Sequence, residues 1–357
     1  MTAVPSQPAV RAGEAATGER LHVEALDGLR GIAALSVMFY HAWVFNAQGW
    51  MAVDFFYCLS GFVIAMAYEG KLEAGLPFLR YVSWRLMRVY PMLFLGGVIG
   101  LLTWRTGEAI GFLSSLGPAS FALSWLAHML LIPFYGQEKA FPFNNVQWSI
   151  LYELLANALH ALFLPILSNR VLAGVLAVSG AVLAWRTFAL GTMNWGFDLR
   201  HMDVGLARMG YSFFAGVLLW RLRGAILPRL PRVPFWILAA AIFVLASVHG
   251  LEAINPWLEP ARQVGTVLLV NPLLVGLGAV CGARGTVIRA LGVLSFPLYA
   301  IHLPLVYLAR STFALALSGM ALKVAVFAAC VPIVGAALLL GRWVDLPLNR
   351  LRRRLFE

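Results

Sequence analysis

Long apolar segments follow one another along almost the whole chain, and this feature restricts the fold more than any other. The eleven segments lie near residues 28–46, 51–68, 89–105, 118–134, 148–168, 171–190, 205–220, 233–250, 264–282, 286–309 and 312–341. A helix of about 20 apolar residues crosses the hydrocarbon core of a bilayer, which is roughly 30 Å thick. Only 12% of the 357 residues are charged, about half the share of a typical soluble domain. The sequence therefore predicts an all-α, polytopic membrane helix bundle.

Clusters of arginine and lysine between the apolar segments predict how the chain is threaded through the membrane. The three clusters contain Lys71, Arg80, Arg85 and Arg88; Arg221, Arg223, Arg229 and Arg232; and Arg350, Arg352, Arg353 and Arg354. Short loops rich in positive charge stay on the cytoplasmic side, so all three clusters should face the cytoplasm. Five segments separate the first cluster from the second, and an odd number of crossings cannot return the chain to the same side. One of the five therefore fails to cross, which leaves about ten transmembrane helices with both termini cytoplasmic. The sequence does not show which segment fails.

The two ends of the chain differ from the apolar region between them. Residues 1–22 are rich in Pro, Ala, Gly and Glu and are expected to be a disordered tail. Residues 23–345 form the membrane domain, and residues 346–357 form a basic cytoplasmic tail. No cleavable signal peptide is visible, because the first apolar run continues as a full span. The net charge of +11 comes from the short loops and does not indicate a nucleic-acid partner. The three cysteines are far apart and show no disulfide or metal-ligand spacing, so no metal is expected.

An arginine and a histidine lie eleven residues apart in the first apolar segment, "LDGLRGIAALSVMFYH" (26–41). At 3.6 residues per turn, Arg30 and His41 share one face of a helix and lie roughly 16 Å apart along its axis. If Arg30 marks the entrance to the bilayer, His41 lies near or just past the midplane. Ionisable residues at that depth are costly and usually mark a pathway or a site. The alternatives are an interfacial anchor for Arg30 and a packing role for His41.

Four more motifs follow this first one in a fixed order. They are "VDFFYCLSGFVIA" (53–65), "RYVSWRLMRVYP" (80–91), "VQWSILYE" (146–153) and "LGVLSFPLYAIHLPL" (291–305). The ordered set resembles the acyltransferase-3 family of bacterial membrane acyltransferases, over about residues 24–345. Three features depart from the family pattern: "FFYCLSGF" replaces "FFVLSGF", "WVDLPLNR" with Asp345 replaces a Glu-Pro-type ending, and the arginine run before the third span is thinner. These departures leave the preference for the acyl donor open.

The resemblance implies an integral O-acyltransferase of the bacterial inner membrane. Such an enzyme moves an acyl group, here expected to be acetyl, from cytosolic acyl-CoA to a hydroxyl of a surface or exported carbohydrate, free or lipid-linked. His41 is then the general base, because the hydroxyl must lose its proton and imidazole titrates near neutrality. Arg30 would contact the CoA phosphates or orient the site. The lipid bilayer is the other expected partner, and a homo-oligomer is left open.

Arginines ahead of the third span are the candidates for binding coenzyme A. Arg85 and Arg88 are three residues apart and share a helix face, and Arg80 lies just upstream. A guanidinium group binds phosphate through two parallel hydrogen bonds. The alternative is that these residues serve only the positive-inside pattern, since arginines precede many spans.

Two ionisable residues inside later spans have two interpretations each. Glu153 is expected either to orient His41 or to pair with an arginine, because an unpaired carboxylate in an apolar segment would be costly. His302 lies between Pro297 and Pro304, so its helix is expected to be kinked. It either lines the cavity or has a structural role.

Several residues at the starts of spans have a simpler interpretation beside the functional one. Asp54 is a helix cap or a polar partner. Trp148 and Ser149 are an interfacial aromatic residue and a cap, or residues of the site. Ser60 and Gly61 are expected to permit close helix packing rather than to supply a nucleophile.

Two other functions stay open from the residues alone. A proton-coupled transporter would also use Arg, His and Glu inside its spans, although no inverted repeat or matched broken helices are evident. The other function keeps the acyl-transfer chemistry and changes the acceptor to a small molecule or a lipid.

Overall fold

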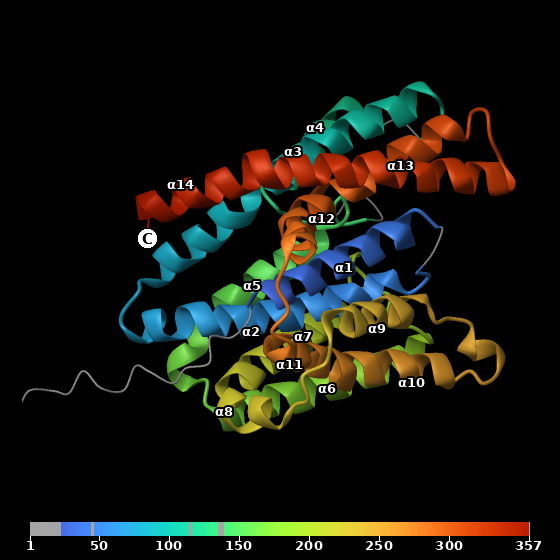
Figure 1. Cartoon of the computed structure of the whole chain (residues 1–357). Helices are drawn as coiled ribbons and strands as arrows, with labels where there is room; N and C mark the ends of the chain where they lie inside the picture. The colour runs from blue at the N-terminus through green and yellow to red at the C-terminus, as the bar shows by residue number, and fades with distance from the viewer. Residues whose placement is uncertain (1–22, 44–45, 114–115, 135–138, 357) are drawn as a thin grey trace, which may run out of the picture.

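The computed structural model describes residues 23–43, 46–113, 116–134 and 139–356, and these residues form a bundle of helices (Figure 1). The helices are α1 (Val23–His41), α2 (Ala52–Glu73), α3 (Phe78–Ala109), α4 (Pro118–Met129), α5 (Gln147–Phe163), α6 (Asn169–Leu190), α7 (Met202–Arg221), α8 (Arg223–Ile226), α9 (Phe235–Ser247), α10 (Leu258–Gly265), α11 (Asn271–Val280), α12 (Thr286–Phe313), α13 (Gly319–Leu340) and α14 (Leu346–Phe356). No strand occurs in these ranges. The tail expected at residues 1–22 lies outside them.

Many of these helices have the length and composition of membrane spans. Seven stretches of the described residues are long and apolar enough to cross a bilayer: Gly49–Glu73, Phe78–Ala109, Gln147–Ile166, Asn169–Leu190, Leu258–Val280, Thr286–Phe313 and Gly319–Arg352. The helices α1 and α7 have 19 and 20 residues and are also long enough, but they carry charged residues such as Arg30 and Arg208. Each of the eleven apolar segments coincides with a helix. The prediction of an all-α, polytopic membrane helix bundle is confirmed.

The short helix α4 is the candidate for the segment that fails to cross. It belongs to the five segments between the first two basic clusters and has 12 residues, or about 18 Å at 1.5 Å per residue. That length is well below the roughly 30 Å of a hydrocarbon core. The apolar helix α9 is also short, with 13 residues, so ten crossings require it to cross together with its flanking residues. The number ten stays a prediction.

The basic clusters lie toward one end of the bundle. Figure 1 shows the turn between α2 and α3, the short helix α8 and the C-terminus on the left of the view. We call this the basic end and the opposite end the far end. The segment 346–357, expected to be a basic tail, is helical as α14 and continues α13 through the π-helical segment Gly341–Asp345. If the basic end faces the cytoplasm, both described ends of the chain lie there.

Close contact between α1 and α12 aligns two motifs that are far apart in the sequence. A Cβ atom on Gly31 would lie 2.3 Å from the carbonyl oxygen of Leu291, and one on Gly292 would lie 2.9 Å from Cβ of Asp27. Only glycine permits this approach of the two backbones. The two helices therefore place Arg30 beside Ser295, and His41 beside His302 further along.

The helices α2 and α7 pack in the same way. A Cβ atom on Gly61 would lie 1.9 Å from the carbonyl oxygen of Phe213, and one on Gly216 would lie 1.9 Å from that of Cys58. Small residues allow membrane helices to approach closely. This contact agrees with the interpretation of Ser60 and Gly61 as a packing position.

Candidate active site

A cavity of about 160 Å³ lies between α1, α2, α3, α5 and α12, and we call it the arginine cavity. Its polar lining consists of Arg30, Arg85, Arg88, Glu153, Ser60, Ser149, Ser295, Tyr57 and Tyr299. Five of the residues predicted from the sequence are among them. Three guanidinium groups line this cavity, and a guanidinium group binds anions such as phosphate through parallel hydrogen bonds, so the cavity suits an anionic ligand.

Glu153 pairs with an arginine and is not in contact with His41. Its Oε1 atom lies 3.5 Å from Nη2 of Arg85 and accepts a hydrogen bond of 2.7 Å from Ser60 Oγ. Nε of Arg85 also donates to Oδ1 of Asn157 at 3.1 Å. These contacts hold the Arg85 guanidinium at the wall of the cavity. Of the two roles that the sequence left open for Glu153, the structure supports the pairing role.

The other two arginines of the cavity have partners on different helices. Nη1 of Arg88 lies 2.9 Å from Oδ1 of Asp345, so the residue at which the chain departs from the family's ending supplies a counter-charge. Nε of Arg30 donates to Ser295 Oγ at 3.0 Å, and its Nη2 lies 3.1 Å from Oδ1 of Asp27. Each guanidinium is thus oriented before any ligand binds, which lowers the entropy lost on binding.

His41 and His302 form a pair at the far end of α1. Nε2 of His302 lies 3.2 Å from Nδ1 of His41, and the ring centroids are 5.1 Å apart. His41 is the last residue of α1, and Arg30 lies two turns inside the helix rather than at its start. The depth of His41 in the membrane stays a prediction.

Backbone carbonyls fix which nitrogen of each ring carries the proton. Nδ1 of His302 lies 3.0 and 2.9 Å from the carbonyl oxygens of Leu298 and Tyr299. A carbonyl oxygen only accepts, so this Nδ1 donates and Nε2 of the neutral His302 ring is an acceptor. Nδ1 of His41 lies 3.0 Å from the carbonyl oxygen of Val37 and faces that acceptor. The proton of His41 is thus on Nδ1, which leaves the Nε2 lone pair available as a base.

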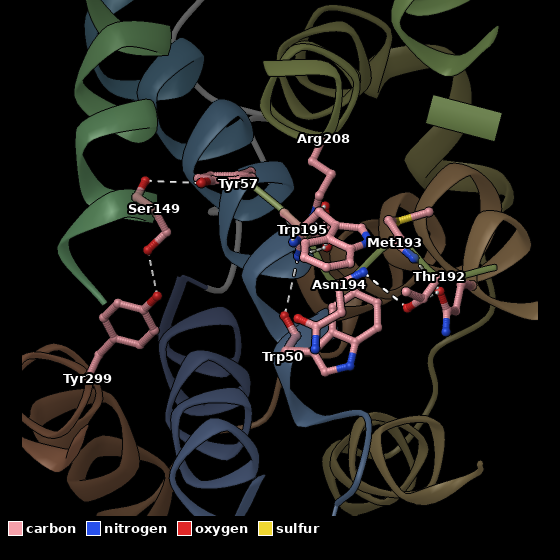
Figure 2. A network of polar contacts seen from close by, with 11 residues as sticks. Trp50, Tyr57, Ser149, Thr192, Met193, Asn194, Trp195, Arg208 and Tyr299 are labelled. Carbon is pink, nitrogen blue, oxygen red and sulfur yellow. Dashed lines mark hydrogen bonds and ion pairs between the residues drawn. The ribbon is translucent and has the colours of Figure 1, made fainter. Parts of the chain in front are cut away.

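Tyr299 connects the arginine cavity to the histidine pair. It lines the cavity, its ring centroid lies 5.8 Å from that of His302, and its hydroxyl lies 2.6 Å from Ser149 Oγ. The hydroxyl of Tyr57 donates to the Ser149 carbonyl oxygen at 3.1 Å (Figure 2). Polar groups thus continue from the arginines toward His302 through the core of the bundle.

A fully buried arginine, Arg208 of α7, forms a second polar centre, which the sequence reasoning missed. Its Nε and Nη2 atoms donate to both carboxylate oxygens of Asp54, the closest at 2.6 Å. Its Nη1 donates to the carbonyl oxygen of Trp195 at 3.0 Å (Figure 2). Cζ lies 5.2 and 5.4 Å from the ring centroids of Trp50 and Trp148. The signal was present, because an arginine inside the apolar segment 205–220 needs a counter-charge.

The loop between α6 and α7 contains Trp195, whose carbonyl accepts a hydrogen bond from Arg208, and it also contacts Tyr40, the residue before His41. Asn194 Nδ2 donates to the hydroxyl of Tyr40 at 3.0 Å, and the backbone N–H of Met193 donates to Gln263 Oε1 at 2.7 Å (Figure 2). Asp54 and Trp148 therefore belong to a structural centre that supports the end of α1.

The predicted residues thus divide into three groups. Arg30, Arg85, Arg88, Glu153 and Ser149 line the arginine cavity. His41 and His302 form the pair, and Asp54 and Trp148 contact Arg208. Arg80 does not line the cavity; its guanidinium lies 5.0 Å from the ring centroid of Trp84.

The fold and these clusters define a multi-pass membrane protein with polar clusters inside its helix bundle, and comparison with known families gives its class. The family model described as an acyltransferase domain, that of the acyltransferase-3 family, matches residues 23–342. The chain therefore belongs to the acyltransferase-3 family and is an acyltransferase enzyme of the membrane. Membership of this family sets aside the transporter interpretation.

Two curated relatives agree with this assignment. The chain is 28% identical over 298 residues to the "Putative membrane-bound transacylase BcsY" of Komagataeibacter xylinus, covering 78% of this chain and 72% of that protein. It is 34% identical over 179 residues to "Protein 2 in picA locus" of Rhizobium radiobacter, covering 44% of this chain and 91% of that protein. No solved structure matches the chain.

Proposed function

We propose that this protein is an O-acyltransferase of the bacterial inner membrane that transfers an acyl group, expected to be acetyl, from cytosolic acyl-CoA to a hydroxyl of a surface or exported carbohydrate. The name of the Komagataeibacter relative, a membrane-bound transacylase, supports the transfer of an acyl group. The acceptor class follows from the resemblance to the family and is part of the proposal.

Acyl-CoA would bind in the arginine cavity through its phosphates. Arg85, Arg88 and Arg30 supply three oriented guanidinium groups there, and guanidinium groups bind phosphate well. The cavity lies nearer the basic end, which the positive-inside pattern assigns to the cytoplasm. The phosphates would compete with Glu153 and Asp345 for Arg85 and Arg88.

The proposed chemical step uses the free nitrogen of His41. Nε2 takes the proton of the acceptor hydroxyl as the oxygen attacks the thioester carbon. The carbon–sulfur bond breaks, and the sulfur leaves as the CoA thiolate, which receives the proton from His41. The products are the ester and CoA–SH, so charge and protons balance. His302 holds His41 in the tautomer that this step needs.

The observation that carries the proposal is the continuous arrangement from the arginine cavity through Tyr299 to the histidine pair. Arg30 and His41 lie on one helix, roughly 16 Å apart, and the pantetheine arm of CoA is long and narrow. Phosphates held beside Arg30 would therefore leave the thioester free to extend toward His41. An acyl group delivered there meets an acceptor approaching from the far end.

The proposal is tested by transfer of labelled acetyl from acetyl-CoA to cell-surface glycan in membranes. His41→Ala should lower the transfer rate by about 10² to 10⁴, the usual contribution of general acid–base catalysis. His249→Ala, at an exposed position outside both clusters, is the matched control and should retain the wild-type rate. Equal rates for the His41 variant and the wild type, with both inserted in the membrane, would contradict the role of His41.

A further inference from the structure

A second cavity, of about 420 Å³, lies toward the far end of α3 and α12. Its aromatic lining is Trp43, Trp104, Phe112, Phe143 and Tyr307, and its polar lining is Thr103, Lys139, Arg310 and Ser311. We call it the aromatic cavity. None of the residues that line it belongs to the arginine cavity.

The aromatic cavity begins next to the histidine pair. Trp43 follows His41 by two residues, and Pro304, which also lines the cavity, follows His302 by two. Lys139 is near enough to His41 for its charge to act on that ring. A ligand in the aromatic cavity therefore lies within reach of the base, on the side opposite to the arginine cavity.

Both charged residues of the described lining are cations, and neither has a carboxylate partner among the described residues. Lys139 Nζ lies 5.4 Å from the ring centroid of Tyr307, and Arg310 Cζ lies 3.1 Å from that of Trp43. These contacts with aromatic faces orient the cations and leave their hydrogen-bond donors available. The cavity thus carries two positive charges that no lining carboxylate offsets.

The positive charge of Lys139 and Arg310 differs from what is expected for this part of the protein. Nη1 of Arg105, the residue that follows Trp104 of the lining, lies 3.1 Å from Oε2 of Glu108, so this arginine has its own counter-ion. Positive charge is also depleted on the extracytoplasmic side of membrane proteins, where the far end is expected to lie. Two cations without a carboxylate partner in the described part of the chain therefore point to an anionic ligand at that end.

The aromatic residues indicate what carries the negative charge. Binding pockets that combine aromatic walls with a few placed polar groups select ligands with an apolar face and polar edges. A pyranose ring has this form, since its C–H groups lie on its faces and its hydroxyls on its edge. The hydroxyls of Thr103 and Ser311 donate to the carbonyl oxygens of Pro304 and Leu308, at 3.1 Å each, so their oxygens are available to accept hydrogen bonds from sugar hydroxyls.

We propose that the aromatic cavity is the acceptor site and that it takes an anionic carbohydrate, with a sugar ring against Trp43 or Tyr307 and the anion on Lys139 and Arg310. This inference rests on the proposed function and deepens it. The anion is either a carboxylate on the sugar, as in a uronic acid, or the phosphate that joins a sugar to a lipid carrier. Both chemistries use the same two cations.

The test is calorimetric titration of the purified full-length protein in zwitterionic nanodiscs, without acyl donor. The probes are a disaccharide containing a uronate, its carboxyl-reduced neutral counterpart, and the neutral disaccharide carrying a 1-phosphate. At least one anionic probe should bind about tenfold or more tightly than the neutral one, as charge-assisted hydrogen bonds predict. A preference for the uronate or for the phosphate then identifies the source of the anion.

Variants separate this site from general surface charge. Lys139→Gln and Arg310→Gln should each reduce the preference for the anionic probe, whereas Lys323→Gln, an exposed cation on α13, should leave it unchanged. Equal binding of all three probes, or a preference that both cavity variants retain, would overturn the inference. Failure of the proposed function would appear differently, as absence of acyl transfer from acyl-CoA to any carbohydrate while these affinities stayed as predicted.

Discussion

At the scale of single residues, the contacts around His41 support its proposed role as a base more directly than its depth in the membrane does. A hydrogen bond between two neutral imidazole rings needs one ring as donor and the other as acceptor. The carbonyl oxygens of Leu298 and Tyr299 bind the Nδ1 proton of His302, so His302 is the acceptor and His41 is the donor. His302 is fully buried, so in the proposed mechanism it is a positioning residue that acts through His41. Its role resembles that of the group that orients the base in other acyl-transfer enzymes.

Substitutions of His302 should distinguish a role in orienting His41 from a role in packing the helix bundle. Gln and Met have similar length, but only Gln can accept the Nδ1 proton of His41. His302→Met should lower kcat by about tenfold or more with KM for acyl-CoA unchanged, and His302→Gln should retain most of the activity. A packing role predicts instead that His302→Met keeps more activity than His302→Gln, because a polar side chain without partners is costly in a buried site. Steady-state kinetics on the two variants decides between these roles.

The sequence identified most of the residues of these clusters but not their partners. The spacing of Arg30 and His41 follows from helix geometry alone, so their shared face was predictable. The pairing of Glu153 with Arg85, or of Asp54 with Arg208, depends on which helices are neighbours and on their rotation. That information is spread over contacts between distant segments, and local periodicity does not contain it.

At the scale of helices, glycines decide how closely the bundle packs. The pairs α1–α12 and α2–α7 place backbone against backbone at Gly31 and Gly61, and these two contacts fix the helices that carry Arg30, His41, Asp54 and Ser60. The sequence predicted the helices and the close packing at Gly61, and parity required one segment not to cross. It could not name α4, because the apolar segment near 118–134 is longer than the helix it contains.

Adding one methyl group tests this packing. Gly61→Ala places a carbon where the Phe213 carbonyl oxygen already lies, so it should destabilise the protein by about 1–3 kcal/mol, as overpacking does. Gly335→Ala, in α13 where nothing lies within 4 Å of the added carbon, is the matched control. It should be neutral or slightly stabilising, since alanine favours helix over glycine by about 1 kcal/mol. Thermal unfolding in detergent gives both values, and equal Tm values for the two variants would contradict the close contact.

At the scale of the whole molecule, two cavities of different character lie on either side of the histidine pair. The arginine cavity is lined by Arg85 and Arg88, which belong to one of the basic clusters, and the aromatic cavity is lined by the last turns of α3 and α12 toward the far end. This arrangement suits a donor and an acceptor that approach from opposite sides and meet at one base. Charge placement in the sequence predicts which end faces the cytoplasm, whereas the cavities arise only when distant helices are assembled.

The central claim is that donor binding and transfer belong to separate clusters, and acetyl-CoA affinity measured on two purified variants tests it most directly. His41→Ala should bind acetyl-CoA as the wild type does. The double variant Arg85→Gln/Glu153→Gln, which removes both charges of one ion pair and so leaves no unpaired buried carboxylate, should bind about tenfold or more weakly. Loss of affinity in the His41 variant, or wild-type affinity in the double variant, would contradict the division of roles between the arginine cavity and the histidine pair.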